Sequence, residues 1–150
     1  MEHPRINRRA LPRIVRAAIV AGTLELLAAV ALTLWDGRRG VSEMLAYVAS
    51  GAVPGVPVRG LPVALLGLAV LYALVAAMAA ACVLAADRAP VLGRHAIVAG
   101  VGYGLVSFAV MTLLIMPWRY GATPAFPGTA TRLFCHVALL GVPIALVARR

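Results

Sequence analysis

The chain has 150 residues, of which 63% are apolar and only 13% are charged. Soluble domains contain about 45–50% apolar and about 25% charged residues. A single domain of this length cannot bury so many apolar side chains away from water. The composition therefore excludes an ordinary soluble domain and indicates a membrane protein surrounded by the lipid bilayer.

The net charge of +9 comes from fourteen arginines, with no lysine, against five acids. Nucleic-acid-binding proteins use such an excess of cations to release counterions from phosphates. Here the arginines stand at the ends of apolar runs, where they meet lipid head groups and set the topology. We therefore expect no nucleic-acid partner.

Four stretches reach the length of about 20 apolar residues that a membrane-spanning helix needs. They cover residues 14–34, 61–86, 96–116 and 130–148. Because open strand edges do not occur in lipid, these stretches must be helices. The sequence predicts an all-α fold, a four-transmembrane-helix bundle that forms a single integral membrane domain over residues 1–150.

The first apolar run also has features of a secretory signal, because Ala29-Val30-Ala31 resembles a cleavage site. Glu25 interrupts this run, and its length suits a span. We therefore expect an uncleaved first helix.

The two connections around the second span differ in length. Residues 36–60 are long enough to hold a short helix over about 42–50, with Ser42 as its cap and Glu43 in its first turn. We expect this helix to be interfacial or shallowly re-entrant. Residues 87–94 form a short turn with Pro90 and Gly93, which predicts that the second and third spans pack as antiparallel neighbours.

The distribution of arginines predicts the orientation. Nine arginines fall on the side of the two termini and five on the opposite side. The positive-inside rule then places both termini in the cytoplasm of a bacterial inner membrane, in a multi-pass protein. Trp35 and Trp118 would be aromatic anchors at the outer interface.

Glu25 is the strongest candidate for a functional residue, because no other ionisable side chain lies between Arg16 and Asp36. An acid at the centre of a bilayer costs about 2.5–3.5 kcal/mol to insert and is usually functional. Glu25 is either a proton-relay or ligand group, or a neutral acid that hydrogen-bonds a neighbouring helix and fixes the register of the bundle.

Other polar side chains are predicted to share the membrane interior with Glu25. His136 lies at a similar depth, so the two residues could pair if the first and fourth helices are adjacent. Tyr72, Tyr103, Ser107 and Thr112 either line a polar seam or hydrogen-bond between helices. No catalytic trio, carboxylate pair or metal-ligand set accompanies them, so we expect no enzyme activity, no cofactor and no metal.

Small residues at a spacing of four predict close helix packing. Gly100 and Gly104 form one such face, and a ladder of alanines that includes Ala73 and Ala77 forms another. Pro143 is expected to bend the fourth span and to free a backbone carbonyl.

Several short motifs resemble those of a group of uncharacterised small bacterial four-span integral membrane proteins, which is distantly similar to the YagU-like inner-membrane proteins. The motifs are Gly22-Thr23-Leu24-Glu25, Val48-Ala49-Ser50-Gly51, Tyr103-Gly104, Met116-Pro117 and Gly141-Val142-Pro143. In that group an acid, usually Asp, stands at the position of Glu25. The resemblance implies a four-span membrane fold and no particular activity.

Two functions follow from these features. The first is a structural or accessory membrane component, which forms a homo-oligomer or binds a membrane-protein partner through small-residue faces. The alternative is a proton- or small-solute-coupled carrier in which Glu25 is the protonatable group and His136 its partner.

Overall fold

The computed structural model describes residues 10–37, 39–55, 57, 59–121 and 128–149, and this part of the chain contains helices and no strand. Four helical stretches are long and apolar enough to cross a membrane: Ala10–Asp36, Leu61–Arg88, Ala96–Tyr120 and Gly128–Ala148. The predicted all-α fold with four membrane-spanning helices is confirmed. The chain thus has the architecture of a multi-pass membrane protein.

The first two spans are continuous, and the last two each contain a π-helical segment. The elements are α1 (Ala10–Asp36), α2 (Val41–Ala52), α3 (Leu61–Arg88) and α4 (Pro90–Arg94), then α5 (Ala96–Ala109), η1 (Val110–Ile115) and α6 (Met116–Tyr120), and finally α7 (Gly128–Phe134), η2 (Cys135–Gly141) and α8 (Val142–Ala148). Of the arginines behind the predicted orientation, Arg5, Arg8, Arg9, Arg38 and Arg150 lie outside the described residues.

Both π-helical segments end two residues before a proline. η1 ends at Ile115 before Pro117, and η2 ends at Gly141 before Pro143. A proline ring clashes with the carbonyl four residues earlier and cannot donate a hydrogen bond to it. A wider turn with bonds from residue i to i+5 relieves that clash, and such turns occur within α-helices. The effect predicted for Pro143 therefore takes the form of a π-helical turn.

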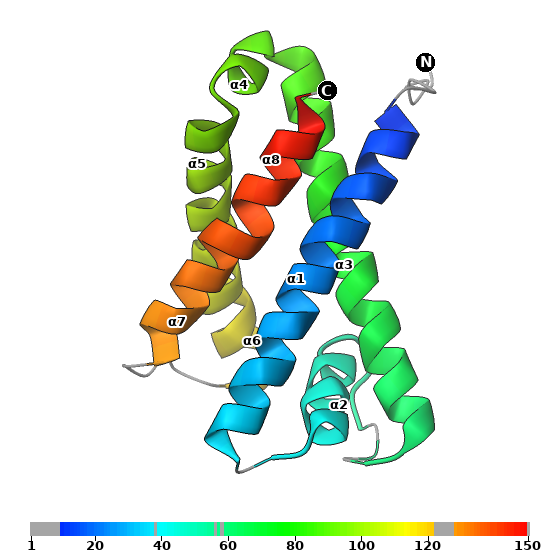
Figure 1. The fold of residues 1–150 in the computed structure, drawn as a ribbon. Helices are drawn as coiled ribbons and strands as arrows, with labels where there is room; N and C mark the ends of the chain where they lie inside the picture. Colours follow the sequence, from blue (N-terminus) through cyan, green and yellow to red (C-terminus); the bar gives the residue numbers. More distant parts are fainter. Residues whose placement is uncertain (1–9, 38, 56, 58, 122–127, 150) are drawn as a thin grey trace.

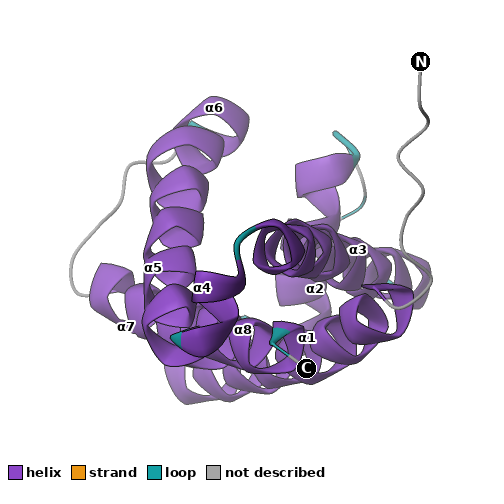
Figure 2. Ribbon diagram, turned by 90° about the horizontal axis from the view of Figure 1, so that it is seen from above, coloured by secondary structure: helices purple, strands orange, loops and turns teal. Residues whose placement is uncertain are grey.

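The four spans form an open arc (Figures 1 and 2). We call the end that carries Ala10, α4 and Ala148 the terminal end, and the opposite end, which carries α2, the α2 end. Along the arc, α3 packs against α1, α1 packs against η2 and α8, and α5 packs against η2 and α8. The spans therefore follow each other in the order second, first, fourth, third.

The prediction that the second and third spans pack as neighbours is wrong. The connection between them folds into the short helix α4, which begins at Pro90 and separates the ends of α3 and α5. Close glycine contacts meanwhile hold α5 against the fourth span. A short connection limits how far apart two helices start, but packing decides which faces meet.

The core of the bundle is made largely of small side chains. Ala17, Ala18 and Ala21 of α1 are buried against Val75 and Ala79 of α3 and against Leu140 and Ile144 of the fourth span. Alanines let helix backbones approach closely, and such contacts drive helix association in lipid. Many large apolar side chains are exposed and few are buried, as expected for a surface that faces lipid rather than water.

The helix α2 begins at Val41, one residue earlier than predicted, and Ser42 does not cap it. Glu43 reaches back instead, and its Oε2 accepts a hydrogen bond of 3.3 Å from the backbone N–H of Gly40. Arg59 donates to the other carboxylate oxygen over 2.5 Å. These hydrogen bonds, from Arg59 first and then from Gly40, lower the pKa of Glu43.

α2 packs against the first turns of α3 and also contacts the end of the third span. Ala46 and Ala49 are buried with Val63. The rings of Tyr47 and Tyr120 stack with their centroids 4.5 Å apart. Burial, followed by the neighbouring Tyr120 phenol, raises the pKa of Tyr47.

Arg119 completes the contact between α2 and the third span. Its Nε donates to the carbonyl of Gly51 over 3.0 Å, and its Nη2 donates to the carbonyl of Ser50. Carbonyls at the end of a helix have no partner inside that helix, so the guanidinium satisfies groups that lipid could not. α2 is therefore fixed to both ends of the arc, to α3 on one side and to α6 on the other.

Candidate functional site

Glu25 faces the interior of the bundle. It lies one turn after Ala21, which is fully buried on the core side of α1. Among the described residues, its Oε1 is buried and has no hydrogen-bond partner. The Cys135 thiol lies within electrostatic reach of its carboxyl. Buried polar atoms normally have a partner, so this oxygen is unusual among the polar atoms of the spans.

Tyr72 lies beside the turn of α1 that precedes Glu25. Its hydroxyl is 2.9 Å from the hydroxyl of Thr23, so these two groups link α3 to α1. Its ring lies directly over Gly22, where an added Cβ would come within 2.8 Å of the Tyr72 Cε1. Gly22 is thus needed to admit the ring, and Tyr72 serves a helix-to-helix contact.

Tyr103 and Thr112 belong to the third span but have different environments. The Tyr103 hydroxyl donates to the backbone carbonyl of Met78 over 2.7 Å and so bridges the gap between α5 and α3. Thr112 is buried within η1. Ser107 is also buried, one turn after Tyr103 on α5. The structure therefore distributes the predicted polar residues over separate contacts.

His136 lies on the side of the fourth span that faces α5. Its Nδ1 is 3.0 Å from the carbonyl of Arg132, one turn earlier. Its ring meets Phe108 edge-on, with ring centroids 6.0 Å apart. In the described part of the chain, no contact joins His136 to Glu25. The pairing that their similar depth predicts is therefore not among the hydrogen bonds or ion pairs of the described residues.

Gly100 and Gly104 lie where the backbones of the third and fourth spans touch. A Cβ at Gly100 would come within 2.7 Å of the Val142 Cα, and a Cβ at Gly104 within 2.6 Å of the His136 carbonyl oxygen. Gly141 supplies the matching small residue on the fourth span. The sequence analysis did not predict that Gly141 belongs to this contact. The signal in the sequence was a glycine two residues before Pro143.

The alanine ladder of the second span is exposed in the described part of the chain. Ala73 and Ala77 both belong to this exposed surface. The buried face of α3 consists instead of Val63, Gly67, Val75, Ala79 and Val83. The ladder therefore faces lipid or another protein.

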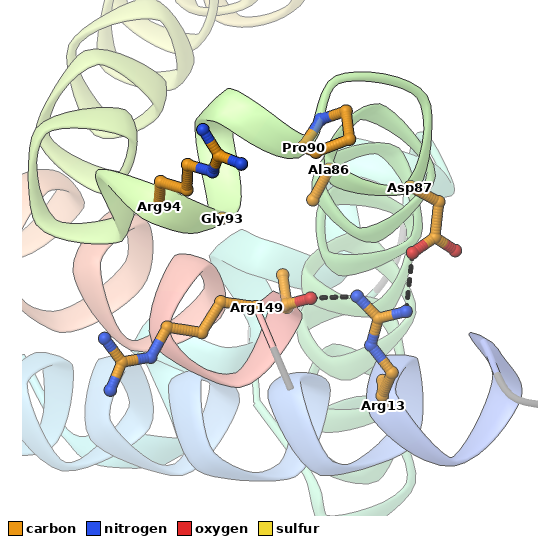
Figure 3. A pocket seen from close by; sticks show the side chains of 8 residues that line it. Arg13, Ala86, Asp87, Pro90, Gly93, Arg94 and Arg149 are labelled. Carbon is orange, nitrogen blue, oxygen red and sulfur yellow. Dashed lines mark hydrogen bonds and ion pairs between the residues drawn. The ribbon is translucent and has the colours of Figure 1, made fainter.

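Sequence reasoning missed an ion pair at the terminal end. Arg13 of α1 donates to Asp87 of α3 over 2.6 Å and also to the carbonyl of Ala148 at the end of α8 (Figure 3). One guanidinium thus ties three spans together. The signal in the sequence was an acid at the end of an apolar run, on the same side of the predicted membrane as Arg13.

Three cavities lie at this terminal end, and Glu25 lines none of them. The first, of about 480 Å³, contains Arg13, Asp87, Arg94 and Arg149 in its wall. The second, of about 330 Å³, is almost wholly apolar and lies between α3, α5 and α8. Within the described ranges no group of three or more His, Cys, Asp or Glu side chains could hold a metal ion.

Comparison with protein-family models, with curated proteins and with solved structures found no match. The resemblance to small four-span bacterial proteins therefore stays a prediction, and the functional argument depends on the geometry of this chain.

Proposed function

We propose that this protein is a structural or accessory component of the bacterial inner membrane that associates laterally with a second copy of itself or with another membrane protein. The observation that carries this proposal is the open arc, in which the second span keeps a small-residue face on the outside. That face consists of Ala73, Ala77, Ala81 and Ala85, all of them exposed.

Small residues spaced by four allow two helices in lipid to come into backbone contact. The third and fourth spans already use such a contact through Gly100, Gly104 and Gly141. The ladder on α3 has the same spacing but no partner helix within the described chain. A helix of a partner protein could approach the ladder as closely as α5 approaches η2 at the internal glycines.

The proposed orientation places the terminal end in the cytoplasm. Arg13, Arg16, Arg88, Arg94 and Arg149 gather at this end, and the positive-inside rule favours that side for them. Trp35 is 92% exposed and Trp118 is 81% exposed, both toward the α2 end, where they suit the opposite interface. The proposal includes no catalytic activity.

Cysteine cross-linking tests association through the ladder. In a background of Cys82→Ala and Cys135→Ala, the variant Ala77→Cys should form disulfide-linked dimers on oxidation if two copies meet at this face. Val20→Cys is the matched control, because Val20 is exposed on α1 at a similar distance from the terminal end.

Purification in mild detergent tests the other kind of partner. A second protein should then co-purify with the wild type. It should be lost from Ala77→Leu, because the larger side chain prevents close approach to the ladder. Equal cross-linking at Ala77 and Val20, together with a monomer that retains no partner, would contradict the proposal.

A carrier role for Glu25 is the second candidate, and the buried, unpartnered Oε1 is the observation that favours it. An acid without a fixed partner is free to exchange a proton with a transported solute or with water. Glu25→Gln should then abolish proton flux into vesicles loaded with a pH-sensitive dye, whereas Glu43→Gln, at the exposed α2 end, should not. Unchanged flux in Glu25→Gln would exclude the role.

A further inference from the structure

The first two of these cavities at the terminal end adjoin each other. Ala86, Gly93 and Ala148 line both of them. One cavity is walled by charged side chains and the other by apolar ones, so together they form a single amphipathic recess. Its charged part lies at the end of the bundle, and its apolar part extends toward the membrane interior between α3 and α5.

The charged part carries an excess of positive charge. Arg13, Arg94 and Arg149 face it with Asp87 as the acid in its wall. Asp87 is engaged by Arg13, whereas no contact in the described part engages the guanidinium groups of Arg94 and Arg149 (Figure 3). The Arg13 Nε is also buried without a partner there. These donors suit a phosphate oxygen.

The apolar part has the shape and lining of a groove for a hydrocarbon chain. Its walls include Cys82 and Ala85 from α3, and Ala99, Gly102 and Val106 from α5. From Ala99 to Val106 the groove follows α5 for about 10 Å at 1.5 Å per residue. Tyr103, which bridges to the Met78 carbonyl, crosses the gap between the two helices inside this stretch.

We propose that this recess binds one anionic phospholipid, with its phosphate in the charged part beside Arg94 and one acyl chain in the groove between α3 and α5. Charge complementarity selects this occupant, because basic pockets between transmembrane helices bind acidic lipid head groups. The recess is open to the bilayer through the gap in the arc, since α3 and α5 do not pack along their length. Ala85 belongs both to the groove wall and to the alanine ladder, so a helix bound along the ladder would end beside this site.

Native mass spectrometry of the full chain, titrated with phosphatidylglycerol or with phosphatidylcholine, tests the head-group contact. The wild type should retain one phosphatidylglycerol in preference to phosphatidylcholine. Arg94→Gln should weaken this binding about fivefold, since one cation near an anionic lipid surface contributes that much. Arg88→Gln is the matched control, because it removes the same charge at the same end but lines none of the described cavities.

A phosphatidylglycerol with a photoreactive acyl chain tests the groove. Cross-links should map to residues 99–106 and disappear in Gly102→Leu. Gly102 has no atom within 4 Å of an added Cβ, so a larger side chain there fills the groove without displacing a neighbour. Equal binding of the two lipids, equal effects of Arg94→Gln and Arg88→Gln, or full competition by soluble glycerol phosphate would each overturn the proposal.

Discussion

The contact between the third and fourth spans depends on glycine, and a single methyl group tests it. Gly104 and Gly102 lie two residues apart on α5, but they face different surroundings. A Cβ at Gly104 would lie 2.6 Å from both the His136 carbonyl oxygen and the Val137 Cα. A Cβ at Gly102 would meet nothing within 4 Å. Gly104→Ala and Gly102→Ala therefore form a matched pair.

The magnitude follows from the missing space. At Gly104 the new methyl group is about 0.8 Å short of 3.4 Å, the near limit of ordinary van der Waals contact, and both atoms it meets are backbone. Overpacking of this kind costs about 1–3 kcal/mol. Both substitutions gain about 0.5–1 kcal/mol from the higher helix propensity of alanine. This gain cancels in the comparison, so Gly104→Ala should be less stable than Gly102→Ala by about 1–3 kcal/mol.

Equilibrium unfolding in mixed micelles, in which sodium dodecyl sulfate is added to a mild detergent, measures this difference. Circular dichroism follows the loss of helix, and the free energy of unfolding is compared at one detergent composition. Gly102→Ala should equal or exceed the wild type. The overpacking cost exceeds about 0.5 kcal/mol. If the free energies of unfolding of the two variants differ by less than about 0.5 kcal/mol, the backbone contact does not stabilise the bundle.

Three further predictions concern the two ends of the bundle. In the same unfolding assay, Arg13→Gln and Asp87→Asn should each lower the free energy of unfolding by about 1–2 kcal/mol. The double variant should lower it by less than the sum of the two single effects, because the two residues share one ion pair. Hydrogen exchange of α2, corrected for intrinsic rates, should rise as the pH falls below 4.5, the ordinary pKa of Glu43. The fold lowers this pKa, and protonation of the carboxylate removes the hydrogen bond from Arg59. Glu43→Gln should abolish this pH dependence. Arg119→Gln should raise exchange in α2 at neutral pH, since the carbonyls at its end lose their donor, and unchanged protection would contradict that role.

The sequence predicted the spans because length and hydropathy alone define them. Residues 61, 96 and 148 are span boundaries in both the prediction and the structure, and the other boundaries moved outward by a few residues. At one end the extension packs within the bundle, because Ala10 is buried with Val83 and Ala148, and at the other Tyr120 stacks on Tyr47. Such extensions depend on packing and on water at the interface, neither of which appears in a hydropathy pattern.

The order of the spans could not be predicted, because it depends on which small-residue faces meet. Gly100 with Gly104 and the alanine ladder have the same spacing and looked equivalent in the sequence. In the structure the glycines contact the fourth span, whereas Ala73 and Ala77 lie on the outside. Gly141 on the fourth span supplies a matching residue without a side chain at the contact with Gly100 and Gly104.

The separation of Glu25 from His136 has a similar cause. Distance along a helix follows from the number of residues, so the similar depth of these two side chains was predictable. The direction of a side chain changes by about 100° with each residue, and a π-helical turn changes this rotation. Cys135 and His136 open such a segment, so one lies within electrostatic reach of the Glu25 carboxyl and the next contacts Phe108. The His136 ring therefore lies against the third span, and a similar depth alone does not bring it to Glu25.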